Sequence, residues 1–307
     1  MQTGNQDKMR MLVTGASGMI GSYICKEFAD LQIDKLGRSQ QNDIVTDIND
    51  CIKLSTHYDI VVHCAGTTSE ASANEVNYRG TTNLLNALEQ NPPRYFVQIS
   101  SLSVYGLTEG NDVTEDYPLR PVTEYGKSKL AAENELKKWC ADKGVVLTIL
   151  RPALTFGNGV SGKAAEMFDA IVKGRYFHIR GNQARRSIVM ADDVAKACRL
   201  TFKEGGIYNV SDGYNHSVIE LGDAMAANCG ENKRIVHCPL KLLKIGAKLG
   251  DILPGFGKLL NSDKLSTLTS SLTFSNARLT EKTGLKFYDT IEVIARRSKD
   301  YPYEFND

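Results

Sequence analysis

The residues that set the architecture of this chain are Met9-Arg-Met-Leu-Val-Thr14, followed directly by Gly15-Ala-Ser-Gly18-Met-Ile-Gly21. The first run is short and mostly apolar, which predicts a buried strand. A helix is expected to follow from Ser22 to Asp30. A glycine-rich turn between a strand and a helix lets backbone N–H groups approach a pyrophosphate at the helix N-terminus. The spacing is G-x-x-G-x-x-G, which differs from the general G-x-G-x-x-G fingerprint, and an ordinary tight turn is the alternative interpretation.

After this turn, short apolar runs that predict strands alternate with helical patterns. A helix is expected from Asn74 to Asn91, because its apolar residues have helical spacing and Pro92-Pro93 cannot continue it. Strands that alternate with helices predict a parallel sheet, whose ligands bind beyond the carboxyl ends of the strands. The sequence therefore predicts an α/β fold built on a doubly wound parallel sheet. The further strands are expected at residues 33–37, 43–47, 59–63 and 94–100.

A second signal is Tyr125-Gly-Lys-Ser-Lys129, which we expect on a helix. Residues four apart share one helix face, so the Tyr125 phenol and the Lys129 ammonium would lie one turn apart. A phenol has an ordinary pKa near ~10, and a neighbouring ammonium lowers that pKa toward neutral pH by favouring the phenolate. The pair is a candidate general acid–base, although a tyrosine and a lysine at this spacing also occur by chance in soluble helices.

Polar residues at two strand ends indicate how ligands would bind. NAD sites place Asp or Glu after the second strand to hold the ribose 2′-hydroxyl, whereas this chain has Gly37-Arg38-Ser39. An arginine without such an acid favours a 2′-phosphate and hence NADP, although Arg38 could equally be a solvated loop residue. Ser100, Ser101 and Ser103 follow a later strand. A hydroxyl there could bind a substrate oxygen, or it could merely satisfy the local backbone.

The composition excludes several classes of function. The chain has 307 residues, 42% of them hydrophobic, and its net charge of +1 comes from interspersed signs, so nothing indicates a nucleic-acid partner. Seven scattered cysteines without a Cys-x-x-Cys pair predict reduced thiols in the cytoplasm, and five histidines without ligand spacing predict no metal. The polar segment Met1–Lys8 is not expected to be a signal peptide, and without a run of ~18 apolar residues no membrane span is expected.

Several short motifs occur in a fixed order that is more specific than any one of them. They are Gly15/Gly18/Gly21, Asp47-Ile48, His63-Cys-Ala-Gly66, Asn77-Tyr-Arg-Gly80-Thr81, Ser101 to Gly106, and Tyr125 with Lys129. With this ordered set, the chain resembles the extended short-chain dehydrogenase/reductases, in the group of nucleotide-sugar epimerases, dehydratases and 4-keto-reductases. The resemblance is good over about residues 9–212 and weak in the C-terminal third. It implies a dinucleotide-binding Rossmann domain at 9–156 plus about 187–212, and a smaller C-terminal α/β substrate domain at about 157–186 plus 213–307.

The resemblance also implies roles for individual residues. Tyr125 would move a proton at the reacting oxygen, Lys129 would hold the nicotinamide ribose and lower the Tyr125 pKa, and Ser101 would hydrogen-bond the substrate oxygen. Arg186 would hold the phosphate of a nucleotide sugar, with Arg185 or a plain surface salt bridge as the alternatives. The implied cofactor-binding residues are Gly15, Ser17, Gly18, Met19, Ile20, Gly21, Arg38, Asp47, Ile48, Cys64, Ala65, Gly66, Tyr125 and Lys129, and the implied substrate-binding residues are Ser101, Ser103, Tyr125 and Arg186.

From this resemblance we expect a cytoplasmic NAD(P)-dependent epimerase or 4-keto-reductase that moves a hydride to or from a nucleotide sugar. NADP is the expected cofactor, with NAD as the alternative. The family's dehydratases carry Thr-Asp-Glu where this chain has Ser101-Leu102-Ser103, which counts against water elimination. The other interpretations are an NADP-dependent reductase of a non-nucleotide ketone of sterol or flavonoid type, and a non-catalytic NADP-sensing regulator. Such regulators typically lose the Tyr/Lys pair, which this chain keeps.

Two helices carry expectations about partners. Family members commonly dimerise through the helix near Asn77 to Leu88 and the helix that carries Tyr125, so we expect a homodimer in which Leu130, Leu136 and Trp139 form part of the contact. The helix expected from Leu240 to Leu249 has Lys241, Lys244 and Lys248 on one face, with Leu242, Leu243, Ile245 and Leu249 broadly opposite. Such a helix can lie on a membrane or pack its apolar side on the core. Substrate choice is expected to depend on the segment from Leu240 to Ser275.

Overall fold

The computed structural model describes residues 9–160, 162–229, 234–252 and 261–296. Its centre is one seven-stranded sheet in the order β11-β7-β5-β4-β1-β2-β3. All neighbouring pairs in this sheet are parallel, which confirms the predicted fold class. The strands are β1 (Arg10–Thr14), β2 (Gln32–Gly37), β3 (Ile44–Val45), β4 (Ile60–His63), β5 (Tyr95–Ile99), β7 (Val146–Pro152) and β11 (Gly206–Val210).

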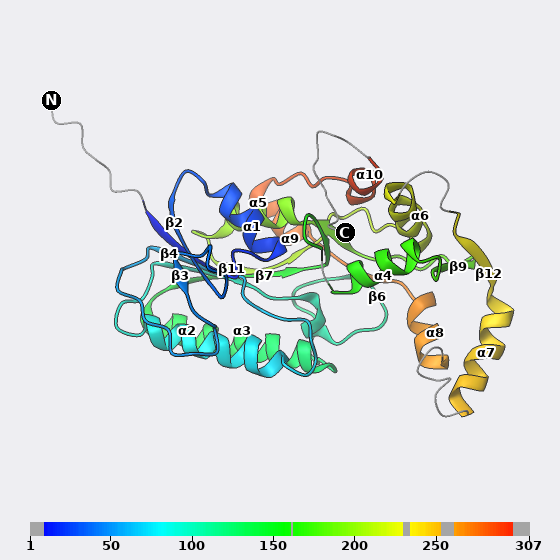
Figure 1. Cartoon of the computed structure of the whole chain (residues 1–307), viewed down its shortest axis with the longest axis horizontal. Coiled ribbons are helices and arrows are strands. Elements are labelled where there is room, and N and C mark those ends of the chain that lie inside the picture. Colours follow the sequence, from blue (N-terminus) through cyan, green and yellow to red (C-terminus); the bar gives the residue numbers. More distant parts are fainter. Residues whose placement is uncertain (1–8, 161, 230–233, 253–260, 297–307) are drawn as a thin grey trace.

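Helices cover both faces of this sheet (Figure 1). They are α1 (Met19–Glu27) and α5 (Ala191–Thr201) on one face, and α2 (Gly80–Leu88) and α3 (Glu124–Lys143) on the other. Successive side chains of a strand point to opposite faces. Met11 and Val13 therefore pack with Phe28 in the first core layer, whereas Leu12 packs with Leu84 in the second. The alternation predicted from the sequence thus produces a sheet that is buried on both sides.

The element boundaries differ from the expected ones at two places that matter for the site. Helix α1 begins at Met19, not at Ser22, so its first turn lies directly on the glycine-rich turn. The helix expected from Asn74 to Asn91 starts with a π-helical turn, η1 (Asn74–Arg79), and continues as α2 only to Leu88. The π-helical turn brings Asn77 close to the loop that follows β4.

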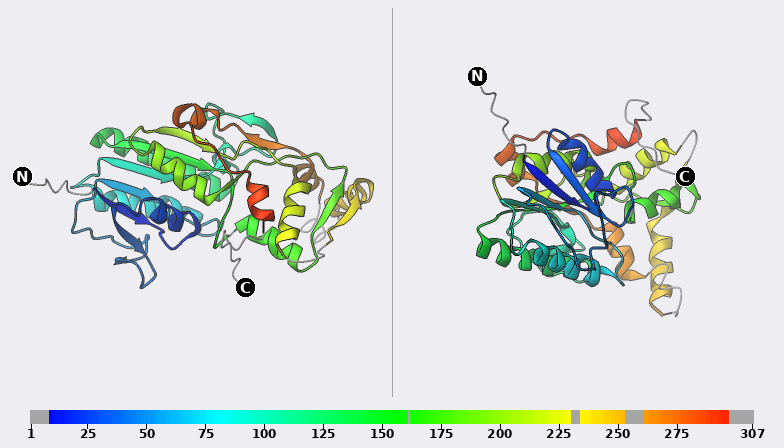
Figure 2. Two further views of the ribbon diagram at one scale, coloured as in Figure 1. Left: turned by 90° about the horizontal axis from the view of Figure 1, so that it is seen from above. Right: turned by 60° about the vertical axis from the view of Figure 1, so that its left-hand side comes forward.

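A smaller α/β region, built from segments on both sides of β11 in the sequence, lies beyond the carboxyl edge of the sheet (Figure 2). Its strands form three two-stranded pairs, β8 with β10, β9 with β12 and β6 with β13. These strands are β6 (Gly110–Val113), β8 (Leu154–Phe156), β9 (Phe177–Arg180), β10 (Ile188–Met190), β12 (Val236–Pro239) and β13 (Leu272–Phe274). The helices are α4 (Gly162–Val172), α6 (Val218–Asn228), α7 (Leu240–Ile252), α8 (Ser262–Thr269), α9 (Ala277–Thr283) and α10 (Thr290–Ala295). Helix α9 packs back on the sheet through Leu279, and the division into two domains stays a prediction.

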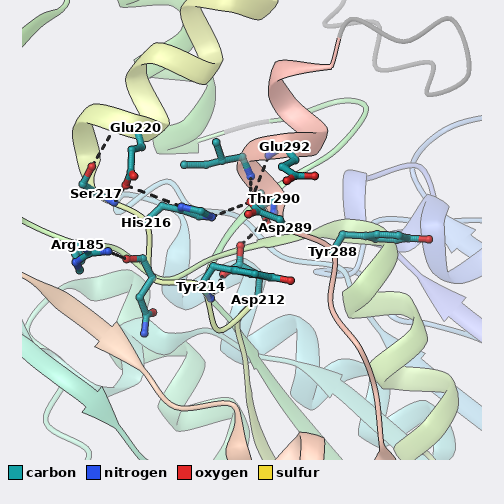
Figure 3. A network of polar contacts seen from close by, with 12 residues as sticks. Arg185, Asp212, Tyr214, His216, Ser217, Glu220, Tyr288, Asp289, Thr290 and Glu292 are labelled. Carbon is teal, nitrogen blue, oxygen red and sulfur yellow. Dashed lines mark hydrogen bonds and ion pairs between the residues drawn. The ribbon is translucent and has the colours of Figure 1, made fainter.

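Polar side chains fix α6 and α10 to the end of β11 (Figure 3). The His216 ring nitrogen Nε2 lies 2.8 Å from the Asp289 carboxylate, which also accepts hydrogen bonds from the first backbone N–H groups of α10. Ser217 and Glu220 form a reciprocal capping box at the start of α6. Asp212, which directly follows β11, accepts from the backbone of α10 as well. The two helices are therefore held at a defined position beside the sheet.

The residues predicted to form a dimer contact also pack within the chain, to different extents. Leu136 is fully buried in the second core layer, and Trp139 packs beside it while its indole N–H donates to Glu89. Leu130 packs on the cluster that contains Val104. Leu136 is therefore used within the chain, Leu130 and Trp139 are only partly buried, and the homodimer stays a prediction. Among the described residues, no helix combines the length and apolarity needed to cross a bilayer, and no three potential metal ligands gather in one place.

Candidate active site

The start of α3 brings Tyr125 to the carboxyl edge of the sheet. Thr123 caps the helix by accepting a hydrogen bond of 3.0 Å from the backbone of Gly126. A Cβ atom at Gly126 would lie 2.6 Å from the Ser103 carbonyl, so only glycine lets the helix start this close to the loop after β5. In that loop Ser101 shares a hydrogen bond with the Tyr125 hydroxyl, and its own hydroxyl donates to Ser103 at 3.1 Å. The predicted Ser101 and Tyr125 are thus in contact.

Lys129 lies one turn after Tyr125 and is only 5% exposed. Its ammonium donates a 3.0 Å hydrogen bond to the backbone carbonyl of Ile99, at the end of β5. Burial lowers the pKa of Lys129 to about 8, and the neighbouring Cys64 and Glu133 offset part of this shift.

The pKa of Tyr125 moves against the sequence-based expectation. Burial raises the pKa of the phenol, and the side-chain hydrogen bond between Tyr125 and Ser101 offsets only part of that rise. The lowering expected from Lys129 is not found in the free protein, because the ammonium is directed at a carbonyl and not at the phenol. In this state the phenol of Tyr125 is neutral at neutral pH.

The loop after β4 lies against Lys129, and Asn77 holds it there. The Asn77 side chain accepts from the Thr67 N–H at 2.8 Å and donates to the Thr67 carbonyl and to Ser128, both at 3.0 Å. A Cβ atom at Gly66 would lie 2.9 Å from Asn77 and 3.0 Å from the Lys129 ammonium. Sequence reasoning placed Asn77 in a motif without giving it a role. A buried amide with every polar atom bonded is the kind of group that positions a loop.

His63 joins the ends of two strands and the start of α2 through a buried chain of hydrogen bonds. Thr14 accepts from the Ala65 N–H at 3.2 Å and contacts His63 Nδ1 at 2.6 Å, while His63 Nε2 contacts Thr81 at 3.0 Å. The Thr81 hydroxyl already donates to the Asn77 carbonyl, so it accepts from Nε2–H and leaves Nδ1 as the acceptor for Thr14. Burial lowers the pKa of His63 to about 3, with Lys129 adding to the shift, so the ring is neutral.

The glycine-rich turn has the shape of a dinucleotide cradle. Gly15 has a φ of +67°, and a Cβ atom there would lie 2.6 Å from the Ala65 backbone nitrogen. At Gly21 a Cβ atom would lie 2.2 Å from the Gly15 carbonyl, so α1 packs directly on the turn. No side chain caps α1 and its first turn contains no acid, which leaves the positive end of the helix open to a phosphate. Ser17, Gly18, Met19 and Ile20 border this opening and are at least partly exposed.

Arg38, predicted to bind a 2′-phosphate, has an acidic neighbour that sequence adjacency did not reveal. Its side chain is 83% exposed and lies 3.9 Å from the carboxylate of Asp47, which follows β3. Asp47 also accepts from the Asn49 N–H at 3.0 Å, and the neighbouring Ile48 packs under Gly80. An arginine and an acid therefore stand together where the adenosine ribose of a dinucleotide would lie, so the site has groups for either form of the cofactor.

Arg186, predicted to hold a substrate phosphate, is engaged elsewhere. Its guanidinium donates to the carbonyls of Thr267 and Ser270, at the end of α8, and to the carbonyl of Arg185. Cations are favourable at the C-terminal end of a helix, which explains this contact. Arg185 donates to the Asn215 carbonyl. Among the described residues Arg186 forms no salt bridge, and its binding of a substrate phosphate stays a prediction.

A buried ion pair lies one helical turn beyond Lys129 on α3. Glu133 and Arg151 are 0% and 1% exposed, and their closest nitrogen–oxygen distance is 2.7 Å. Ser100 donates to Glu133 at 2.6 Å, and Arg151 donates to the Tyr105 hydroxyl at 2.9 Å. The pair thus joins α3 to β5 and β7 directly below Lys129. Ser100 is buried and donates to this pair, which differs from the local backbone bond that its structural alternative predicted.

Comparison with known proteins agrees with this geometry. The family model described as NAD dependent epimerase/dehydratase family matches residues 11–211. The N-acetyl-alpha-D-glucosaminyl-diphospho-ditrans,octacis-undecaprenol 4-epimerase of Escherichia coli O157:H7 is 28% identical over 269 residues, which cover 79% of this chain and 79% of that protein. The UDP-glucose 4-epimerase of Vibrio cholerae is 28% identical over an alignment of 326 positions, which covers 95% of each chain.

Solved structures share the fold. RMD from Pseudomonas aeruginosa complexed with NADPH superposes with a TM-score of 0.69 at 24% identity, covering 94% of this chain and 97% of that one. The Thermus thermophilus UDP-glucose 4-epimerase in complex with NAD gives 0.68 at 22% identity, covering 94% and 100%. The family match extends over the nucleotide cradle, Ser101, Tyr125 and Lys129, and it confirms the resemblance seen in the sequence. This chain is an enzyme of the NAD dependent epimerase/dehydratase family.

Proposed function

We propose that this enzyme is a nucleotide-sugar 4-epimerase that uses NAD(P), with 4-keto-reduction of a nucleotide sugar as the second candidate. The observation that carries the proposal is the contact of Ser101 with Tyr125 beside the buried Lys129. Residues 102 and 103 are leucine and serine, so no carboxylate is available there to drive elimination of water. The two relatives named above, both 4-epimerases, support the first candidate.

The chain's own groups would divide the work as follows. Ser101 would hold the oxygen of the reacting carbinol or ketone, and Tyr125 would give or take the proton at that oxygen. When bound, NAD(P) supplies the hydride acceptor and donor. Lys129 would bind the ribose next to the nicotinamide, since its ammonium is already held at the end of β5 and adjoins Gly66. Asn77 and the His63 chain would keep the loop after β4 at the correct distance from Lys129.

Arg38 is the specific observation that favours the second candidate. An exposed arginine beside the expected ribose would bind a 2′-phosphate, and a preference for NADP favours reduction because cells keep that pool reduced. Asp47 opposes this preference, because a carboxylate in the same place binds a 2′-hydroxyl and repels a phosphate. The choice of cofactor and the choice of reaction are therefore tested together.

The test incubates the purified enzyme with UDP-linked and GDP-linked hexoses and with their 4-keto derivatives, while the absorbance of reduced nicotinamide is followed. An epimerase forms product without a net change in the cofactor, and it carries cofactor through purification. A 4-keto-reductase consumes NADPH in proportion to product. Reduction of a simple ketone without turnover of any nucleotide sugar would overturn both candidates in favour of a non-nucleotide reductase. Binding of NADP without any turnover would favour a sensing regulator.

A further inference from the structure

Helix α7 carries three parallel rows of side chains, each displaced by one residue from the last. The inner row, Leu240, Leu243 and Ala247, packs with Ile179 and Leu265 in a small core. The next row consists of Lys241, Lys244 and Lys248. The outer row consists of Leu242, Ile245 and Leu249. Because one residue turns a helix by about 100°, the outer row lies nearly opposite the inner row, with the lysines between them.

The outer row is apolar and open to solvent. Leu242 and Ile245 are each 60% exposed and Leu249 is 49% exposed. Single exposed leucines are ordinary on protein surfaces, but a continuous row on one helix face is not. The sequence placed Leu243 with this row, and the structure moves it to the inner row. The inner row alone anchors the helix, so the outer row contributes nothing to the packing described for α7.

The three lysines indicate which kind of partner would cover the outer row. All three are exposed, and among the described residues none of them forms an ion pair. Lysine is depleted at protein–protein interfaces, whereas rows of lysine beside an apolar face are typical of helices that lie on a bilayer surface. The charge of the neighbouring Asp251 is directed at α8, because its carboxylate accepts hydrogen bonds from Ser262 at the start of that helix. Asp263 lies on α8 itself.

The position of α7 on the molecule allows such a contact. Figure 1 shows α7 at the end of the molecule farthest from the N-terminus, projecting with α8 away from the sheet. The right-hand view of Figure 2 places α8 between α7 and the rest of the molecule. A flat surface can therefore approach the outer row without meeting the nucleotide cradle. We propose that the apolar outer row and the lysine row of α7 dock the enzyme on an anionic lipid bilayer. This proposal does not depend on which reaction the enzyme catalyses.

The test is flotation of the full-length enzyme with vesicles of phosphatidylcholine alone or mixed with phosphatidylglycerol. We expect binding to the mixed vesicles and little binding to phosphatidylcholine vesicles. Changing Lys241, Lys244 and Lys248 to Gln should lower the partition coefficient by roughly fivefold per lysine, and added salt should act in the same direction. Ile245→Asp should lower it on the order of tenfold or more, because an apolar side chain no longer enters the lipid.

Matched controls are Leu200→Asp on α5, where a leucine that is 45% exposed is replaced, and Lys127→Gln on α3. Both should bind vesicles like the wild type, and thermal melting should show all variants folded. Equal binding by wild type and Ile245→Asp would overturn the proposal, as would absence of binding to mixed vesicles. Light scattering that shows a dimer which Ile245→Asp dissociates would assign the outer row to a second copy of this chain and would also overturn it.

Discussion

Two regions depart from the usual distribution of polar and apolar groups, in opposite directions. One lies beneath the candidate active site, and the other is the surface of α7. Below Tyr125, the charged Lys129, Glu133 and Arg151 are almost completely buried. On α7, the apolar Leu242 and Ile245 are mostly exposed. Buried charge is unfavourable unless it is paired, and exposed apolar surface is unfavourable unless something covers it. The comparison shows that the buried charged groups find their partners within the chain. The exposed apolar groups of α7 have no such partners among the described residues, and we propose that a bilayer covers them.

The largest effect is expected where the buried polar region meets the substrate. Tyr125→Phe removes the proposed proton carrier and keeps the ring, so turnover should fall by a factor on the order of 10²–10⁴. Cofactor affinity should barely change. The control is Tyr58→Phe, which removes a buried hydroxyl bonded to Asp34 and should keep full turnover. Steady-state rates and nucleotide titrations measure both, and near-normal turnover of Tyr125→Phe would remove this residue from the mechanism.

The next effect concerns stability alone. Glu133→Gln leaves Arg151 buried without its charge partner, so the free energy of unfolding should fall by about 3–5 kcal/mol. Replacing both residues together, Glu133→Leu with Arg151→Met, should recover most of this loss because no unpaired charge remains. Urea denaturation of the three proteins measures the difference. If the single variant were as stable as the wild type, the buried pair would not join α3 to the sheet as described.

Replacing Lys129 should raise the free energy of unfolding and lower the activity, because a buried ammonium is unfavourable for folding. Its pKa is about 8 in the folded protein against an ordinary 10.5, so the unfolded chain binds more protons between these values. Stability contributed by this group is therefore present above pH 10.5 and is lost as pH falls toward 8. At pH 7, Lys129→Met should raise the free energy of unfolding by roughly 1–3 kcal/mol, allowing for the lost hydrogen bond to Ile99.

The same variant should be nearly inactive, because the nicotinamide ribose would lose its proposed ligand. At pH 10 to 11 its advantage in stability should shrink. Lys127→Met, at an exposed position on the same helix, should change neither quantity. A loss of stability in Lys129→Met at pH 7 would show that the ammonium is a net stabilising group and would contradict the predicted gain.

A smaller effect is expected at the exposed Arg38. Arg38→Ala should weaken NADP binding by about tenfold and leave NAD binding unchanged, since only NADP carries a 2′-phosphate. Asp47→Asn should act in the opposite sense and favour NADP. Isothermal titration with both dinucleotides gives the two ratios. Equal loss of NAD and NADP affinity in Arg38→Ala would mean that the guanidinium does not contact the 2′ position.

The smallest effect is expected on the outer row of α7. Ile245→Ser should change the free energy of unfolding by no more than about 0.5 kcal/mol, because the side chain lies outside the core. Leu243→Ser on the inner row should lower it by about 2–5 kcal/mol. Thermal denaturation of the two variants distinguishes the rows. Comparable losses would mean that both rows are packed within this chain.

The sequence predicted the sheet because its signals are local. The apolar run before Gly15, the glycine turn and the alternation of strands with helices depend on neighbours in the chain, and the family's ordered motifs located Ser101, Tyr125 and Lys129. What it missed depends on contacts between distant segments. Nothing near Arg186 in the sequence indicates that the end of α8 lies within its reach. Leu136 and Trp139 have a helical spacing that fits an inner or an outer face equally well, and only the packing on β5 and α2 decides.

The pairing of β6 with β13 has a consequence for the way the chain is made. Leu272 pairs with Gly110, and in its sheet β6 has no other strand beside it. At synthesis rates of roughly 5–20 residues per second, the ribosome needs about ten to thirty seconds to supply the partner strand. During that time the backbone N–H and C=O groups of residues 110–113 lack their partner strand, and unpaired strand backbone is a site from which aggregation starts. The sequence of β6, Gly-Asn-Asp-Val, lowers this risk of aggregation, because Asn111 and Asp112 belong to residue types that are depleted in strands and favour contact with water.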